Sequence, residues 1–294
     1  MPLLDSDMKY DRQAVETAYA KVNLALHVRH RRPDGYHALE SLFAFAQDGD
    51  MIEGRVTDDG AITLLVDGPF GAQLDAGADN LAVKAAMVLR DWLGEPRGAV
   101  LRLTKNLPVA SGIGGGSADA AATLRLLNGL WDARIERPAL EQLALEIGSD
   151  VPACIASTTR RVRGRGEVLE DHDLPGLAGK PLLLVNPGVG LSTGSVFAGW
   201  DGVDRGALAA DSLAQLRMKG RNDLESSAIK QAPVIGDVLA RLERCEGRLL
   251  SRMSGSGATC FALFEAGAGM QAAARALSAE YPEWWIMETR VRTA

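Results

Sequence analysis

The sequence is short of cysteine, of basic charge and of long hydrophobic runs, and each shortage excludes a class of protein. Three cysteines among 294 residues, without C-x-x-C spacing, predict neither a disulfide framework nor a zinc site. A net charge of −6 lacks the basic footprint of a nucleic-acid-binding protein. No apolar run approaches the roughly 20 residues of a membrane helix, and the first twenty residues do not resemble a secretory signal. We therefore expect a cytoplasmic globular protein with neither a nucleic-acid nor a membrane partner.

Arginine is nevertheless concentrated in one stretch. Arg160, Arg161, Arg163 and Arg165 lie within six positions of one another. An acidic chain can still carry a local basic pocket for an anion, but such a charge run is more typical of a solvated loop, which is the interpretation we favour.

Glycine is concentrated in the stretch from Pro108 to Ala118, where four glycines occupy the five positions 112–116. An apolar run, Ala99 to Leu103, precedes it, and a helix-like segment follows from Ala118. Glycine lets the backbone approach a ligand closely. A loop that leads into a helix start also offers free N–H groups to an anion. A tight turn needs only one or two glycines, so the pattern predicts a phosphate-binding loop.

The two commonest phosphate loops do not fit this stretch. A P-loop would place a lysine directly after the glycines, and none follows. The dinucleotide fingerprint would start at the end of the strand and place an acid about 20 positions later. Here Lys105 to Pro108 intervene and the nearest later acid is Asp119. The loop is of another type.

Three further residues, in two stretches of the chain, carry polar side chains in apolar surroundings. Lys21 and Asn23 share one face of a predicted strand from Ala18 to Val28. That face is either buried, in which case the lysine needs a partner, or a solvent-facing edge. Asp150 precedes Val151 and Pro152, where it could cap a short helix or act as a base.

Tyr36 and His37 follow a Pro-Asp-Gly turn. A histidine beside a tyrosine is often structural, but at a turn the pair could recognise a planar group. Alternating strands and helices predict α and β elements in both halves of the chain, divided near residues 175–180. A helix capped by Asn80 is expected to run through Trp92, and residues 1–17 lack a pattern and are expected to be an extension.

Taken together, three stretches resemble the motifs of the GHMP kinases (galactose, homoserine, mevalonate and phosphomevalonate kinases). They are Ala20–Leu24 with Asp34–His37, Pro108–Ala122, which contains the glycine loop, and Ser254–Ala258. The match is most similar to the branch that transfers the γ-phosphoryl group of ATP to the 2-hydroxyl of 4-diphosphocytidyl-2-C-methyl-D-erythritol, a step of the non-mevalonate route to isoprenoid precursors. The resemblance implies an α+β fold of two domains. These are an α/β ATP-binding domain at 18–178 and a ferredoxin-like α+β domain at 179–294.

The resemblance also implies a role for each motif. Lys21 and Asp150 would be catalytic, with Asp150 as general base. Asn23, Tyr36, His37 and Phe197 would bind the substrate, the aromatic residues by contacting its cytosine ring. The ATP-binding residues would be Asn80, Lys105, Pro108, Val109, Ala110, Ser111, Gly112, Ile113, Gly114, Gly115, Gly116, Ser117 and Ala118.

Some features qualify the transfer or leave alternatives open. Mg²⁺ is expected with ATP, but its ligands are not evident, and Ala118 stands where many GHMP kinases have a second serine. A GHMP kinase acting on another alcohol is one alternative, although Tyr36 and His37 would then lack a cytidine to bind. A non-catalytic nucleotide-binding protein is another, although it would not require both Lys21 and Asp150.

Overall fold

The computed structural model describes residues 13–293, which form two compact units that each combine several stretches of chain. The first unit contains residues 13–18, Gly49–Leu107 and Gly116–Ala156. The second contains Tyr19–Asp48, Pro108–Gly115 and the residues from Ser157 onward. Two long strands, β1 (Gln13–Arg31) and β2 (His37–Thr57), contribute to both units.

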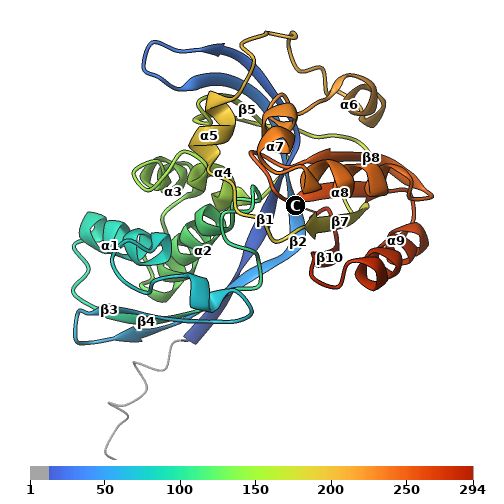
Figure 1. Ribbon diagram of the computed structural model, residues 1–294. Coiled ribbons are helices and arrows are strands. Elements are labelled where there is room, and N and C mark those ends of the chain that lie inside the picture. The colour runs from blue at the N-terminus through green and yellow to red at the C-terminus, as the bar shows by residue number, and fades with distance from the viewer. Residues whose placement is uncertain (1–12, 294) are drawn as a thin grey trace, which may run out of the picture. The chain divides into compact units, whose positions relative to one another are not determined.

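The first unit packs helices on a small sheet. Strand β4 (Gly98–Thr104) pairs in parallel with β3 (Ile62–Asp67) and antiparallel with the Met51–Thr57 end of β2. Helices α1 (Leu81–Leu93), α2 (Gly115–Leu130), α3 (Arg137–Ala144) and α4 (Val151–Ala156) accompany it (Figure 1). A 3-10 turn, η1, spans Gly71–Gln73.

Helix α2 is the buried helix of this unit, and nearly all its residues from Ala118 to Leu127 are inaccessible. Its small alanines allow it to lie close to the sheet. Gly54 on β2 shows how close the approach is, because a Cβ at this position would lie 2.7 Å from the Leu126 side chain. The helix that follows the glycine loop is therefore fixed by close packing.

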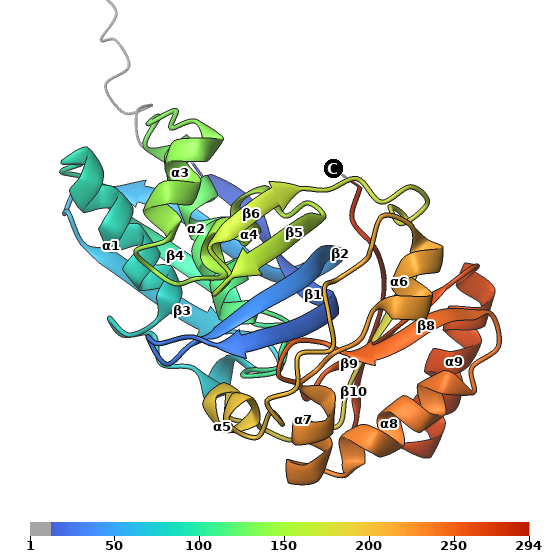
Figure 2. The ribbon, with the colours of Figure 1, turned by 90° about the horizontal axis from the view of Figure 1, so that it is seen from above.

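The second unit contains a four-stranded antiparallel sheet in the order β10-β7-β9-β8. The strands are β7 (Pro181–Asn186), β8 (Arg248–Met253), β9 (Cys260–Phe264) and β10 (Trp285–Arg290). Because side chains alternate along a strand, Leu183 on β7 and Ala262 on β9 belong to one face. Residues of α8 (Val234–Glu243) and α9 (Gly267–Glu280) share a core with that face, and Figure 2 shows both helices beside the sheet. This βαββαβ order is ferredoxin-like, as predicted.

The rest of the second unit surrounds the early strands. The start of β2 pairs antiparallel with β5 (Arg160–Gly164), which pairs with β6 (Val168–Asp171). Three short helices complete the unit: α5 (Thr193–Ala198), α6 (Leu213–Lys219) and α7 (Glu225–Gln231). Within residues 13–293, every helix falls short of the length and apolar content that a bilayer crossing requires.

The structure corrects several local predictions. The arginine run is not a solvated loop. It lies in and just after β5, where Arg160 is 2% exposed and pairs with Asp171, while Arg163 pairs with Glu170. Strand β1 begins at Gln13, so residues 13–17 are strand, and the remainder of the expected extension lies outside the described residues.

Candidate active site

Lys21 and Asn23 lie on a buried face of β1, with side chains 4% and 2% exposed. This excludes the solvent-facing edge. The Lys21 Nζ lies 4.1 Å from the centroid of the Phe43 ring, a cation–π distance. Asn23 Nδ2 donates to the Oγ of Ser41 at 2.9 Å. The Asn23 Oδ1 is buried and has no hydrogen-bond partner among residues 13–293, so an unused acceptor remains beside Lys21 on this strand.

The glycine loop lies directly on this strand. The backbone N–H of Lys21 donates to the carbonyl of Ile113 at 2.9 Å. Gly112 and Gly114 have φ angles of 78° and 65°, a region that favours glycine. A Cβ at Gly114 would lie 3.1 Å from the Lys21 Cε, so a larger residue there would press on the lysine. The loop then continues into the first turn of α2, where N–H groups lack partners within the helix.

The turn from Ser254 to Gly257 holds the loop from a third segment of the chain. Ser254 Oγ accepts from the Asn23 N–H at 3.0 Å and donates to the Gly112 carbonyl at 2.9 Å. The Thr259 N–H donates to the Ser111 carbonyl at 3.1 Å. A single serine hydroxyl thus joins β1 to the loop. The three sequence motifs, far apart along the chain, meet in the second unit.

An aromatic cluster forms at the start of β2. His37 stacks on Phe197 with ring centroids 5.2 Å apart, and Trp200 meets His37 edge-on at 5.6 Å. Burial and the nearby Arg31 lower the pKa of His37 below its ordinary value, so its ring is neutral at pH 7. Tyr36 is 59% exposed, and Arg165 lies over its ring at 5.1 Å. The sequence analysis named His37 and Phe197 as candidate substrate-binding residues and did not name Trp200, which joins them in this cluster.

In the first unit, Asn80 serves as the N-cap of α1, as predicted. Its Oδ1 accepts from the Ala82 N–H at 3.0 Å, and its Nδ2 donates to the Asp75 carbonyl at 2.8 Å. Both ends of the side-chain amide therefore have protein partners.

Lys105 lies between two buried carboxylates of the same unit. Its Nζ is 2.6 Å from Asp50 Oδ2 and 2.6 Å from Asp119 Oδ2, and its side chain is 2% exposed. Asp50 Oδ1 also accepts from the N–H groups of Asn106 and Leu107. This geometry favours a structural role for the lysine side chain, at the point where the chain enters the glycine loop, over the expected contact with ATP.

The charges of this cluster do not cancel, since one ammonium faces two carboxylates. Burial, reinforced by Asp50 and opposed by Lys105, raises the pKa of Asp119 to about 8. The Asp119 Oδ1 is buried without a hydrogen-bond partner in the described part of the chain. Asp119 therefore holds a proton at neutral pH. The two carboxylates outweigh the effect of burial and raise the pKa of Lys105, which stays charged.

Asp150 lies at the start of α4, also in the first unit. The residues that follow, from Val151 to Ile155, are buried, whereas Asp150 itself is only half-buried. Within residues 13–293, no group of three or more histidine, cysteine, aspartate or glutamate side chains could hold a metal ion.

Comparisons with known proteins give consistent results for both halves of the chain. The family "GHMP kinases N terminal domain" matches residues 80–158, and "GHMP kinases C terminal" matches residues 206–283. A protein from Rhizorhabdus wittichii named 4-diphosphocytidyl-2-C-methyl-D-erythritol kinase is 50% identical, over 94% of each chain. A relative of the same name from Sphingopyxis alaskensis is 49% identical, over 94% of this chain and 98% of its own.

A solved structure agrees with the sequence relatives. The crystal structure of a 4-(cytidine 5'-diphospho)-2C-methyl-D-erythritol kinase superposes with a TM-score of 0.78 at 33% identity. The superposition covers 94% of this chain and 99% of the other. The likeness therefore extends over both units and is not confined to the motifs.

Proposed function

Since this chain belongs to the GHMP kinases, and within them to the family of 4-diphosphocytidyl-2-C-methyl-D-erythritol kinases, we propose that it transfers the γ-phosphoryl group of ATP to the 2-hydroxyl of 4-diphosphocytidyl-2-C-methyl-D-erythritol. The observation that carries this proposal is the meeting of the three motifs in one unit, where Ser254 joins Asn23 to the glycine loop. Phosphoryl transfer needs mainly positioning and charge stabilisation, which such a rigid assembly supplies.

The glycine loop, residues 108–118, would hold the ATP phosphates. Positive φ angles at Gly112 and Gly114 and the start of α2 support this role, because they leave backbone N–H groups for anionic oxygens. Ser117 supplies the hydroxyl of this loop. Mg²⁺ would be bound mainly by the phosphate oxygens of ATP and would neutralise the charge of the transferring group.

Asp150 would accept the proton of the attacking 2-hydroxyl as general base. Lys21 would stabilise negative charge near the reacting oxygens, a role supported by its place against Gly114. Asn23 would accept a hydrogen bond from a substrate hydroxyl, since its Oδ1 lacks a partner among the described residues.

The aromatic cluster would bind the cytosine ring. His37 and Phe197 are in contact at 5.2 Å. A base inserted between two rings needs about 7 Å, two contacts of roughly 3.5 Å each. Cytosine therefore either stacks on an outer face of the pair or separates the two rings on binding. In both arrangements the neutral ring of His37 can hydrogen-bond the edge of the base, and Tyr36 is exposed at the entrance.

An assay of ADP release with ATP, Mg²⁺ and a panel of alcohols tests the proposal. We expect turnover with the cytidyl substrate and none with mevalonate or homoserine. Turnover only with another acceptor would contradict the substrate assignment and would leave the kinase assignment intact.

A variant separates the base from a helix cap. Asp150→Asn should lower kcat by roughly 10² to 10⁴ with little change in ATP affinity, as expected for loss of a general base. Ser149→Ala, at the exposed neighbouring position, is the matched control and should retain activity. Near-wild-type turnover of Asp150→Asn would show that Asp150 only caps α4.

A further inference from the structure

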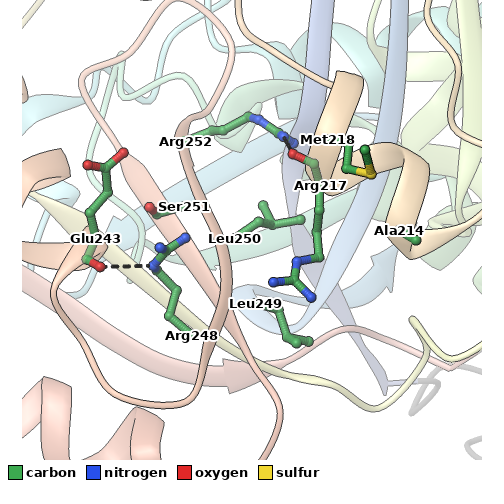
Figure 3. Close-up of a pocket in the computed structure, with 9 residues that line it drawn as sticks. All are labelled: Ala214, Arg217, Met218, Glu243, Arg248, Leu249, Leu250, Ser251 and Arg252. Atoms are coloured by element: carbon green, nitrogen blue, oxygen red, sulfur yellow. Dashed lines mark hydrogen bonds between the residues drawn. The ribbon is translucent and has the colours of Figure 1, made fainter.

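A second basic site lies in the second unit, outside the three motifs. Helix α6 and strand β8 border an open pocket of about 620 Å³, shown in Figure 3. Three arginines line it, Arg217, Arg248 and Arg252, together with one acidic residue, Glu243. In a chain of net charge −6, a pocket with this excess of positive charge is unusual.

Arg252 forms the fixed floor of this pocket. It is 8% exposed and donates to the carbonyls of Leu24 at 2.8 Å and Leu216 at 2.7 Å. Leu216 belongs to α6, so Arg252 holds α6 against β8 by hydrogen bonds to backbone carbonyls. Burial lowers the pKa of Arg252 to about 10, so it stays charged at neutral pH. Its guanidinium is therefore occupied by hydrogen bonds to backbone carbonyls.

Arg217 and Arg248 make fewer hydrogen bonds within the protein than Arg252 does. The guanidinium of Arg217 has no hydrogen-bond or ion-pair partner in the part of the chain that the structure describes, and that of Arg248 donates only to the Glu243 backbone carbonyl at 3.3 Å. Figure 3 shows the two groups on either side of the β8 backbone, Arg217 on the side of α6 and Arg248 on the side of Glu243, with the Glu243 carboxylate turned away from Arg248. The positive charge inside the pocket is therefore not neutralised by the protein.

The remaining wall supplies an unused hydroxyl and apolar surface. Ser251 Oγ is buried and has no hydrogen-bond partner within residues 13–293. Leu249, Leu250, Ala214 and Met218 also line the pocket, and Met218 is 83% exposed. The register of β8 against β9 shifts between Arg248 and Leu250, so this end of β8 departs from regular alternation.

We propose that this pocket is an anion-binding site for a small phosphorylated molecule, distinct from the glycine loop. The guanidinium groups of Arg217 and Arg248, which come from different elements, would each bind phosphate oxygens. The leucines and Met218 would contact the carbon part of the ligand. A volume of about 620 Å³ exceeds the need of a lone inorganic phosphate and suits a phosphate ester or diphosphate.

Calorimetric titration with inorganic diphosphate tests the site. A saturating non-hydrolysable ATP analogue keeps the glycine loop occupied, and about 0.15 M salt screens diffuse surface charge. We expect wild type to bind one diphosphate with Kd below about 1 mM. Arg217→Gln with Arg248→Gln should weaken binding at least tenfold, since each removes charge-assisted hydrogen bonds. Circular dichroism checks that this double variant is folded.

Two single variants distinguish a built site from general attraction. Lys219→Gln removes a neighbouring exposed charge of α6 that does not line the pocket, and should leave Kd unchanged. Glu243→Gln removes the only acidic lining residue and should tighten binding a few-fold. Absence of binding in wild type, an unchanged Kd in the double arginine variant, or an equal loss in Lys219→Gln would each overturn the proposal.

Discussion

The buried cluster of Lys105, Asp50 and Asp119 allows a sharp test with two variants. Removing the cation should lower the free energy of unfolding, whereas removing one acid should abolish part of the dependence of that free energy on pH. Lys105→Met leaves the buried Asp50 carboxylate without its counter-charge, beside the protonated Asp119. Breaking a buried ion pair in this way costs about 3–5 kcal/mol. For a chain of 294 residues this corresponds to a fall in melting temperature on the order of 10 °C.

Asp119→Asn keeps the shape of the side chain and leaves an amide oxygen that can accept the hydrogen bond from Lys105 Nζ, but it removes the titratable carboxyl group. Between pH 4 and pH 8 the native carboxyl retains its proton, because its pKa is raised to about 8, whereas the unfolded carboxyl does not. Wild-type stability should therefore fall with rising pH by up to about 1.4 kcal/mol per unit, and this fall should be absent in the variant. Above pH 8 the difference in unfolding free energy between wild type and Asp119→Asn should become constant.

Urea denaturation of both variants from pH 5 to pH 9 measures these effects. Asp67→Asn is the control, because it breaks a half-exposed pair with Arg102 that should contribute at most about 1 kcal/mol. A loss of less than about 1 kcal/mol in Lys105→Met would contradict the role of Lys105 as a buried counter-charge. A difference in unfolding free energy between Asp119→Asn and wild type that does not change with pH would contradict the raised pKa of Asp119.

Further predictions concern the loop, the aromatic cluster and a buried histidine. Gly112→Ala would place a Cβ 2.4 Å from the Ser254 carbonyl oxygen, so the KM for ATP should rise at least about tenfold; Gly188→Ala, at a similar φ with nothing within 4 Å, is the control in the same kinetic assay. Trp200→Leu removes the ring that contacts His37 edge-on and should raise the KM for the cytidyl substrate several-fold, as expected for about 1 kcal/mol of aromatic contact. In that variant an unchanged substrate KM would exclude a role for Trp200. Burial, with a smaller effect of Arg221, lowers the pKa of His27 below 6.5. The unfolded imidazole therefore binds a proton more readily than the native one, and the free energy of unfolding should fall as pH falls from 6.5. Denaturation midpoints of His27→Gln should decline less steeply than wild type over that range, and parallel curves would contradict this.

The features that sequence predicts well are those with a strong local signal. The ferredoxin-like order of the C-terminal strands, which the family resemblance implied, is confirmed. Among the local patterns, the strand–loop–helix around Gly112 and the Asn80 cap of α1 are confirmed. These depend on glycine conformation, on capping and on apolar periodicity, which neighbouring residues determine. Whether the predicted site residues act as assigned stays a prediction.

The features that were missed depend on partners distant in the chain. Strand β8 contains Arg248, Ser251 and Arg252, so it lacks a continuous apolar run and is recognisable only beside β9. The arginines of β5 resemble a loop until acidic partners on β6 are placed opposite them. Likewise, nothing local to Lys105 indicates that Asp50 and Asp119 will enclose it.

The serine that joins Asn23 to the glycine loop also has a consequence for biosynthesis. Asn23 and Ser254 are 231 positions apart. At roughly 5–20 residues per second, a ribosome needs about 10–50 s to make the chain between them. During that interval β1 exposes backbone groups that later bond to Arg221 and Asp223. We expect nascent chains stalled before residue 221 to be protease-sensitive at β1 and to bind chaperones, and protection there should develop only after Ser254 has left the ribosome.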